Sequence, residues 1–367
     1  MRIGIDAGCW TNRRGYGRYA RELSQAMVEA DAQDDFVFFA DEQTAAEFPI
    51  GRPNVRVVPV RQAVSPAVAA ASGTNRSPVD LLRFSRMVAR ERPDVLWFPS
   101  VYSFFPVPPG VPCVVTVHDV IPERFPELTL PTIRDRLLWQ AKVRLALFQA
   151  RLVLTVSEYS KQQIAQVLRV PESKIYVTLE APAAVYRPVD SKSEIAECAR
   201  SVGLPAGARW FIYVGGFNPH KHVDRIIRSF ASLTTRLESD HEVYLLLVGP
   251  GDADAFHHDI GTLRELTERL GISKRVLWPG YLPDEELRLL YAGAVAALLM
   301  SGCEGFGLPA VEAAACGTPV IATTESPLPR LLEGGGIFLE PGDQGGLADA
   351  MWTLFEDRQK RNACGRR

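Results

Sequence analysis

The stretch from Ala294 to Thr323 constrains the fold more than any other part of the sequence. It begins with an apolar run that is typical of a buried parallel strand. The flexible turn Gly305-Phe306-Gly307 follows, and then a segment with Pro309 at its start and Gly317 just past its end. Those are the usual places of proline and glycine in a helix, and a second apolar run predicts the next strand. A strand–loop–helix–strand unit of this kind predicts an open α/β sheet that binds ligands where its strands end.

Two carboxylates flank the predicted helix start. Glu304 precedes the glycine turn and Glu312 lies early in the helix. The free N–H groups and the dipole of a helix start favour an anion. A carboxylate beside a phosphate would repel it, so we expect both acids to face a neutral polyol such as a sugar or a ribose. In the alternative interpretation, Glu312 only complements the helix dipole and Glu304 is solvated.

The full string EGFGLPAVE, residues 304–312, followed by CGTPV, residues 316–320, is long and specific. It resembles the Glu-x7-Glu motif of retaining glycosyltransferases with the two-Rossmann-domain (GT-B) fold, in particular glycosyltransferase family 4. The resemblance implies an α/β chain in which two doubly wound Rossmann-like domains face a cleft. It also implies the retaining transfer of a sugar from a sugar nucleotide to an acceptor hydroxyl.

A second glycine loop, GGFNPHK at residues 215–221, follows the predicted strand Trp210–Val214. It resembles the loop that binds the donor phosphates in this family. Lys221 is the natural cation for a diphosphate. The family often has an arginine where Gly216 stands, so the group that matches the second phosphate charge is left open here.

Near the N-terminus, GYGRYA at residues 15–20 matches the dinucleotide pattern G-x-G-x-x-A, and Asp41 follows the next strand. We reject NAD binding because Gly8–Arg14 separate the first glycine from the strand Ile3–Ala7, whereas the NAD turn follows its strand directly. The family resemblance instead implies that Gly15 and Gly17 line the acceptor side. An NAD-dependent dehydrogenase remains the alternative.

His118 ends the predicted strand Val114–Val117, at the edge where sites lie. The resemblance implies that it lies near the donor sugar. It further implies that the amides of Gly307 and Leu308 act with Lys221 on the leaving diphosphate. The predicted catalytic residues are Glu304, His118 and Lys221. The predicted donor- and substrate-binding residues are Glu312, Gly307, Leu308, Phe306, Gly216, Gly15, Gly17, Tyr281 and Leu282, of which Tyr281 and Leu282 are expected near the nucleobase.

The 367 residues, 47% of them hydrophobic, are enough for two medium domains. The segment Tyr186–Gly207 holds prolines, glycines and mixed charge. We therefore predict an acceptor-side domain at 1–187, a linker at 188–208 and a sugar-nucleotide-binding domain at 209–367. Ala63–Ser77, rich in small and polar residues, is expected to be a mobile loop.

The location is expected to be cytoplasmic. The six cysteines form no CxxC pair, the start MRIGID predicts a strand with no signal peptide, and no apolar run approaches the ~20 residues of a membrane span. The net charge of −2 does not indicate a nucleic-acid partner. The basic amphipathic segment Leu81–Arg90 is expected to pack on a sheet, although a peripheral contact with the inner face of the membrane stays open.

Asp252-x-Asp254, with His257 and His258 nearby, looks like the metal-binding D-x-D of the other large transferase fold. Because GT-B enzymes use helix dipoles and cations in place of a metal, we expect no metal and no other cofactor.

The loops GYGRY, HD and VGGFNPHK look most like bacterial mannosyltransferases of surface polysaccharides. The favoured function is thus hexose transfer, mannose from GDP-mannose, to a hydroxyl of a glycan or a polyprenyl-linked glycan. The alternatives are a UDP-sugar-dependent transferase of the same fold and a non-catalytic GT-B protein that only binds nucleotides.

Overall fold

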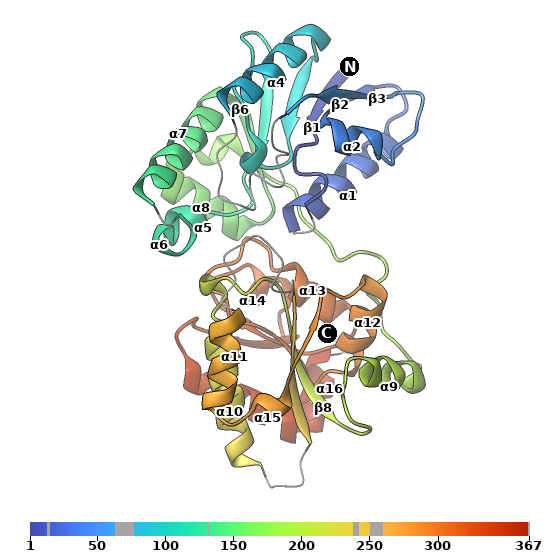
Figure 1. Cartoon of the computed structure of the whole chain (residues 1–367), viewed down its shortest axis with the longest axis vertical. Helices are drawn as coiled ribbons and strands as arrows, with labels where there is room; N and C mark the ends of the chain where they lie inside the picture. The colour runs from blue at the N-terminus through green and yellow to red at the C-terminus, as the bar shows by residue number, and fades with distance from the viewer. Residues whose placement is uncertain (13–14, 63–76, 131, 238–241, 250–259, 366–367) are drawn as a thin grey trace. The chain divides into compact units, whose positions relative to one another are not determined.

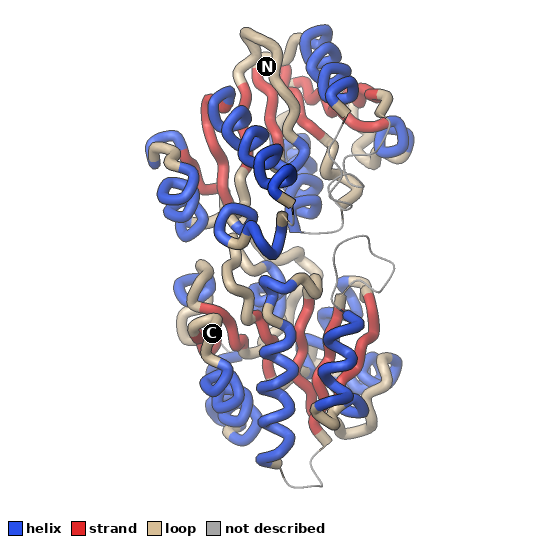
Figure 2. Tube along the Cα trace, turned by 60° about the vertical axis from the view of Figure 1, so that its left-hand side comes forward, coloured by secondary structure: helices blue, strands red, loops and turns tan. Residues whose placement is uncertain are grey.

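The computed structural model describes residues 1–12, 15–62, 77–130, 132–237, 242–249 and 260–365. The chain divides into two compact units, Met1–Glu180 and Ala181–Arg367 (Figure 1). Each unit is built on one parallel sheet, and Figure 2 shows helices on both sides of the strands in each. This is the doubly wound α/β architecture that the sequence predicted, twice over.

The first unit has a seven-stranded sheet in the order β3-β2-β1-β4-β5-β6-β7. The strand order reverses between β1 and β4, so the first unit has a topological switch point there. The strands are β1 (Arg2–Asp6), β2 (Asp35–Asp41), β3 (Val55–Val60), β4 (Val95–Phe98), β5 (Cys113–Thr116), β6 (Ala150–Thr155) and β7 (Ile175–Val177). The main helices are α1 (Gly15–Ala30), α2 (Glu42–Ala46), α4 (Pro78–Glu91), α5 (Ile121–Arg124), α6 (Pro126–Thr129), α7 (Ile133–Gln149) and α8 (Glu158–Leu168).

The core of the first unit lies between these strands and helices. Phe39 of β2, Phe98 of β4 and Val115 of β5 are fully buried in one cluster with Phe84 and Val88 of α4. The amphipathic segment Leu81–Arg90 therefore packs its apolar side on the sheet, as expected. The expected loop at Ala63–Ser77 lies outside the described residues except for Ser77, which caps α4.

The second unit has a six-stranded sheet in the order β10-β9-β8-β11-β12-β13. Here the order reverses between β8 and β11. The strands are β8 (Arg209–Val214), β9 (Val243–Val248), β10 (Val276–Gly280), β11 (Ala296–Leu299), β12 (Val320–Thr323) and β13 (Gly336–Leu339). The helices are α9 (Lys192–Ser201), α10 (Val223–Arg236), α11 (Ile260–Arg269), α12 (Asp284–Gly293), α13 (Leu308–Ala315), α14 (Leu328–Leu331), α15 (Gln344–Glu356) and α16 (Arg358–Gly365).

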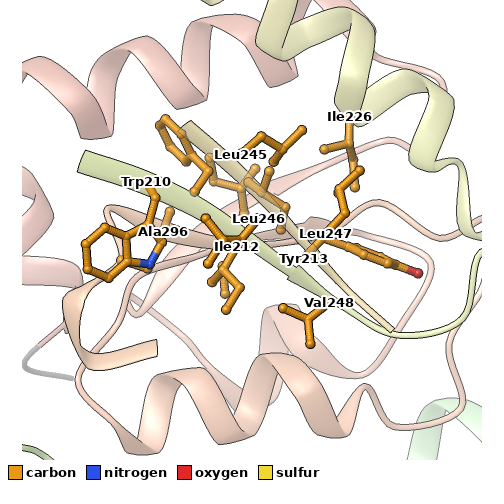
Figure 3. Close-up of a cluster of buried hydrophobic side chains, with 14 of the residues drawn as sticks. Trp210, Ile212, Tyr213, Ile226, Leu245, Leu246, Leu247, Val248 and Ala296 are labelled. Carbon is orange, nitrogen blue, oxygen red and sulfur yellow. The ribbon is translucent and has the colours of Figure 1, made fainter. Parts of the chain in front are cut away.

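The central strands of the second sheet carry near-continuous apolar runs because both faces are covered. Figure 3 shows this core, in which Trp210, Ile212 and Tyr213 of β8 lie beside residues 245–248 of β9, with Ala296 and Ile226 in the same cluster. The strands that flank the switch point are thus fixed by close packing.

The boundary between the units lies earlier than expected. Residues 181–187 and the expected linker 188–208 belong to the second unit, and most of that linker is the helix α9 and its flanks. Cys198, Ala199 and Leu204 are buried in the core of the second unit, so this segment is packed and not a free connection. Among the described residues, no helix is long and apolar enough to cross a membrane.

Candidate active site

The second unit brings two predicted motifs together at its switch point. The loop 215–222 follows β8, and the loop 300–307 follows β11, its neighbour in the sheet. Strand order reverses between these two strands, which is where open α/β sheets bind ligands.

Lys221 and Glu304 form an ion pair across the two loops. The Nζ atom of Lys221 lies 2.6 Å from Oε1 of Glu304, and Ser301 donates a second hydrogen bond to the same oxygen. The side chains retain only 20% and 11% of their exposure, so the pair is largely withdrawn from water. None of the described residues donates a hydrogen bond to the other oxygen, Oε2 of Glu304.

Backbone hydrogen bonds fix the positions of these loops. The amide of Gly302 donates to the carbonyl of His220 at 2.8 Å, and the amide of Glu304 donates to Glu325 at 3.0 Å. The loops after β8, β11 and β12 are therefore held together by backbone hydrogen bonds.

Tyr213 of β8 stabilises the loop that follows this strand by a hydrogen bond. Its hydroxyl donates to the carbonyl of Gly216, and its side chain is fully buried. Burial raises the pKa of this hydroxyl well above its usual value, and the charge of Glu304 raises it further, so the hydroxyl keeps the proton it donates. Gly216 itself is half-buried.

The close approach of Gly215 and Gly249 leaves no room for larger residues. A Cβ atom on Gly249 would lie 2.2 Å from the carbonyl oxygen of Gly215. The loops that follow β8 and β9 can approach this closely only because position 249 has no side chain.

Helix α13 begins directly after the glutamate loop. Gly307 caps it with a φ of 91°, in the left-handed region that favours glycine, and no side chain supplies a cap. Pro309 is the second helical residue, one place later than expected, and it has no N–H. The N–H groups of Gly307 and Leu308 therefore precede the first hydrogen-bonded turn, as an anion site requires.

Phe306 and Glu312 are both buried, at 5% and 4% exposure. Glu312 lies one turn into α13, and Glu304, which the alternative interpretation expected to be solvated, is itself only 8% exposed. A buried carboxylate is stable only with compensating partners.

Tyr281 and Leu282 follow β10, at the edge of the sheet and two strands from β8. Leu282 is part of the hydrophobic core, whereas Tyr281 is 59% exposed. The structure therefore leaves only Tyr281 accessible for the predicted contact with a nucleobase.

In the first unit, His118 follows β5 and is held on two sides. Its Nε2 atom lies 2.9 Å from the carbonyl of Pro99, so this nitrogen carries the proton and donates. Its Nδ1 atom lies 3.7 Å from Oε1 of Glu180. The ring packs edge-on against Tyr19 at 4.8 Å between centroids, and it is therefore fixed in one orientation.

Gly15 and Gly17 open helix α1. Gly15 is exposed, whereas Gly17 is buried so closely that a Cβ atom would lie 2.0 Å from the carbonyl of Asn12. Helix α1 begins at Gly15 and β1 ends at Asp6, so no tight turn joins them. This spacing agrees with our rejection of an NAD fingerprint.

The predicted alternative metal ligands, Asp252, Asp254, His257 and His258, lie outside the described residues. Within the described ranges, no group of three or more His, Cys, Asp or Glu residues could hold a metal ion.

Two family models match the sequence. Residues 13–178 match the model described as Glycosyltransferase Family 4, and residues 195–367 match the model described as Glycosyl transferases group 1. The chain belongs to the family 4 glycosyltransferases. This family 4 chain is 29% identical over 259 residues to the O-antigen chain mannosyltransferase B of Escherichia coli, covering 69% of this chain and 64% of the relative. Its matches to curated relatives span less than two thirds of their own lengths.

Solved structures confirm the GT-B fold of this family 4 chain. The sucrose-phosphate synthase of Thermosynechococcus elongatus superposes with a TM-score of 0.76 at 20% identity, covering 100% of this chain and 92% of that one. The Anabaena protein HepE in complex with UDP-glucose superposes with a TM-score of 0.73 at 21% identity, with 100% and 92% covered.

Three residues that contact the predicted site residues within their own units were missed by sequence reasoning. Ser301 and Glu180 are polar residues just after strands, a position that could have pointed to them. Tyr213 lies inside an apolar strand, so its position in the sequence did not suggest a role at a site. Only the folded loop brings the carbonyl of Gly216 within reach of its hydroxyl.

Proposed function

We propose that this chain is a retaining, metal-independent hexosyltransferase. It would move mannose from GDP-mannose to a hydroxyl of a glycan or a polyprenyl-linked glycan. The observation that carries the proposal is the ion pair of Lys221 and Glu304 at the switch point of the second unit, next to the start of α13. A cation, a helix start and a carboxylate together suit a sugar diphosphate.

Lys221 separates the carboxylate from the phosphate. An ammonium group has three N–H donors, and Glu304 accepts one of them, so two remain for phosphate oxygens. Together with the N–H groups of Gly307 and Leu308, Lys221 would stabilise the negative charge that develops on the leaving diphosphate. The repulsion expected between Glu304 and a phosphate is thereby offset.

Glu304 would hold the donor sugar through Oε2, the oxygen that accepts no hydrogen bond from the described residues. Its Oε1 atom stays on Ser301 and Lys221, which fixes the orientation of the carboxylate. Glu312, one turn into α13, would bind the ribose, and Tyr281 would lie near the base. These roles follow the family motif at residues 304–312.

His118 is not proposed to transfer a proton, because its Nε2 atom already donates to the carbonyl of Pro99. Its predicted role beside the donor sugar is the one that the family resemblance implies. The proposal contains no covalent protein intermediate, because none of the proposed site residues is a nucleophile with a base beside it. The acceptor hydroxyl would attack from the face of the leaving phosphate, with that phosphate assisting.

The choice of mannose rests on the likeness to the mannosyltransferase of Escherichia coli. HepE, which was solved with UDP-glucose, supports the alternative of a UDP-sugar donor. A thermal-shift panel of GDP, UDP and ADP decides between them. A ligand at 100 times its dissociation constant stabilises the chain by ~2.7 kcal/mol, and we expect GDP to give the largest shift.

Stabilisation by UDP alone would overturn the choice of GDP-mannose and favour the alternative donor. A chain that binds a nucleotide but neither hydrolyses nor transfers the sugar would be a non-catalytic binding protein. Stabilisation by NAD would favour a dehydrogenase.

Retention is tested by the anomeric configuration of the product. With an α-linked donor, proton NMR of the first product formed should show an α linkage. A β-linked first product would mean inversion and would overturn the proposed mechanism.

Metal independence is tested with a chelator. The proposed site supplies Lys221 and helix amides as its positive groups, so transfer should continue in EDTA. If EDTA abolished transfer and Mg²⁺ or Mn²⁺ restored it, metal independence would be wrong. Asp252 and Asp254 would then become candidate metal ligands.

The proposed location is the cytoplasm. All six cysteines are free thiols, as is usual in a reducing compartment. With a net charge of −2, we propose no nucleic-acid partner.

A further inference from the structure

The first unit has a groove that the proposed transfer reaction does not use. It encloses about 500 Å³ between α5, α6, α7 and the end of α8, which lie together in Figure 1. Its walls are largely apolar and include Leu130, Val143, Leu147 and Val167. Such a groove takes hydrocarbon more readily than it takes a sugar.

Helix α7 carries apolar residues on two faces. One face, with Trp139, Val143 and Ala146, is buried against the sheet. On the other, Ile133, Leu137 and Phe148 are 73%, 60% and 85% exposed. A helix that packs on a sheet needs only one apolar face. The second face does not contribute to the hydrophobic core of this unit.

The exposed apolar face is continuous with the groove. Residues 133, 137, 144 and 148 are spaced by four or seven, so they follow one side of the helix. Arg144, which belongs to this row, also lines the groove. The groove and the exposed face therefore form one surface, which we call the α7 surface.

The charges of the α7 surface are mostly positive. Arg136, Arg144 and Arg169 line the groove, and Arg134 is exposed beside it. Glu123 is the one acid among the lining residues, and it accepts a hydrogen bond from Trp139 at 2.6 Å. Burial raises the pKa of Glu123 to about 7, so this carboxyl is partly neutral at physiological pH.

We propose that the α7 surface binds an anionic lipid membrane. The exposed apolar side chains would enter the boundary between headgroups and acyl chains, the groove would take part of one acyl chain, and the arginines would meet the headgroup phosphates. Large apolar side chains interleaved with arginines fit this occupant. A second copy that paired through this same surface would set these arginines against one another. The proposal does not depend on the identity of the donor sugar.

The test is co-sedimentation of the full chain with vesicles. We expect binding to vesicles of phosphatidylcholine and phosphatidylglycerol in equal parts, weaker binding to phosphatidylcholine alone, and a loss of binding as salt is raised. The double variant Leu137→Ser, Phe148→Ser should bind the anionic vesicles at least tenfold more weakly, because two exposed apolar side chains no longer insert.

Leu82→Ser is the matched control, because Leu82 is 53% exposed on the basic helix α4. It should bind as the wild type does. Arg134→Gln and Arg144→Gln should each weaken binding to anionic vesicles about fivefold, and neither should change binding to phosphatidylcholine. The thermal midpoints of all variants should match the wild type, since these side chains are exposed.

Absence of binding to anionic vesicles, or an equal loss with Leu82→Ser, would overturn the proposal. So would a lipid-free dimer, seen by sedimentation equilibrium, that the double variant abolishes, because the occupant would then be a second copy. Binding of GDP is measured on the same samples. Its failure would count against the proposed function and leave the membrane result standing.

Discussion

Glu304 and Lys221 together form the chemical centre of the proposed donor site. Both are largely buried, and taking two charges out of water costs several kcal/mol per ion. The attraction between them and the hydrogen bond from Ser301 offset that cost. A buried ion pair contributes little net stability, so stability alone does not explain this one. Its place at the switch point favours a role in ligand binding.

The two glutamates of the motif should behave differently when their charges are removed. Glu304→Gln should lower kcat by about a hundredfold with little change in nucleotide affinity, because its charge matters most as positive charge builds on the sugar. Glu312→Gln should raise KM and weaken the nucleoside diphosphate alike, because it acts on the ribose in ground and transition states.

Steady-state kinetics and calorimetric titration of GDP measure both quantities for each variant. If Glu304→Gln abolished GDP binding and left kcat intact, or if Glu312→Gln left GDP affinity untouched, these two roles would be wrong.

The raised pKa of Glu123 predicts that the stability of the folded chain depends on pH. Burial is the largest cause that raises its pKa to about 7, so the folded chain holds this proton more tightly than the unfolded chain does. The stability it contributes is present at low pH and is lost as pH rises towards 7. The loss should reach about 3 kcal/mol, at 1.36 kcal/mol per pKa unit.

Glu123→Gln keeps an oxygen that can accept from Trp139 and cannot ionise. From pH 5 to pH 8 the wild type should lose stability relative to this variant, as measured by unfolding in urea. Glu127→Gln, at an exposed position of α6, is the control and should follow the wild type. A constant difference between the wild type and Glu123→Gln would contradict the prediction.

At the scale of single elements, α1 depends on Gly17. A helical glycine replaced by alanine normally gains about 1 kcal/mol, but here the new Cβ would lie 2.0 Å from the carbonyl of Asn12. Gly17→Ala should instead destabilise the chain by about 2 kcal/mol or more. Gly51→Ala, where a Cβ would meet nothing within 4 Å, should change stability by less than about 0.5 kcal/mol.

Thermal unfolding of the two glycine variants checks this. A Gly17→Ala variant as stable as the wild type would show that Asn12 moves aside without cost. The role of Gly17 would then be to leave space for an acceptor, as the family resemblance implies, and not to allow close packing.

Most elements could be predicted from the sequence because local pattern and burial agree. The strands expected at Ile3–Ala7, Val114–Val117 and Trp210–Val214 lie within one residue of the bounds of β1, β5 and β8. By contrast, α9 was missed within the expected linker, because its helical pattern is short and charged and depends on packing against the second unit.

The site could be predicted only in part. Two separate motifs pointed to Glu304 with the start of α13 and to Lys221, and the structure brings Lys221 and Glu304 within 2.6 Å. The hydrogen bonds from Ser301 and Tyr213 join residues through tertiary contacts, which no local pattern encodes. Leu282 was expected at a nucleobase, but its apolar side chain is used by the core.

At the scale of the whole molecule, the chain repeats one doubly wound α/β architecture, but the two units carry different side chains at their switch points. Each unit has a switch point, between β1 and β4 in the first and between β8 and β11 in the second. Among the described residues, a lysine paired with a glutamate lies beside a helix start only at the second switch point. We therefore propose that the donor diphosphate binds to the second unit.

Titration of GDP and guanosine into the wild type, Lys221→Ala and Lys274→Ala tests this central claim most directly. Lys274 is exposed in the same unit, so its variant is the control for loss of one positive charge. A charge-assisted hydrogen bond contributes roughly 1.5–3 kcal/mol, so Lys221→Ala should bind GDP about ten- to a hundredfold more weakly, with guanosine affinity unchanged. Equal losses for GDP and guanosine, or no loss for GDP, would contradict the assignment of the diphosphate to this site.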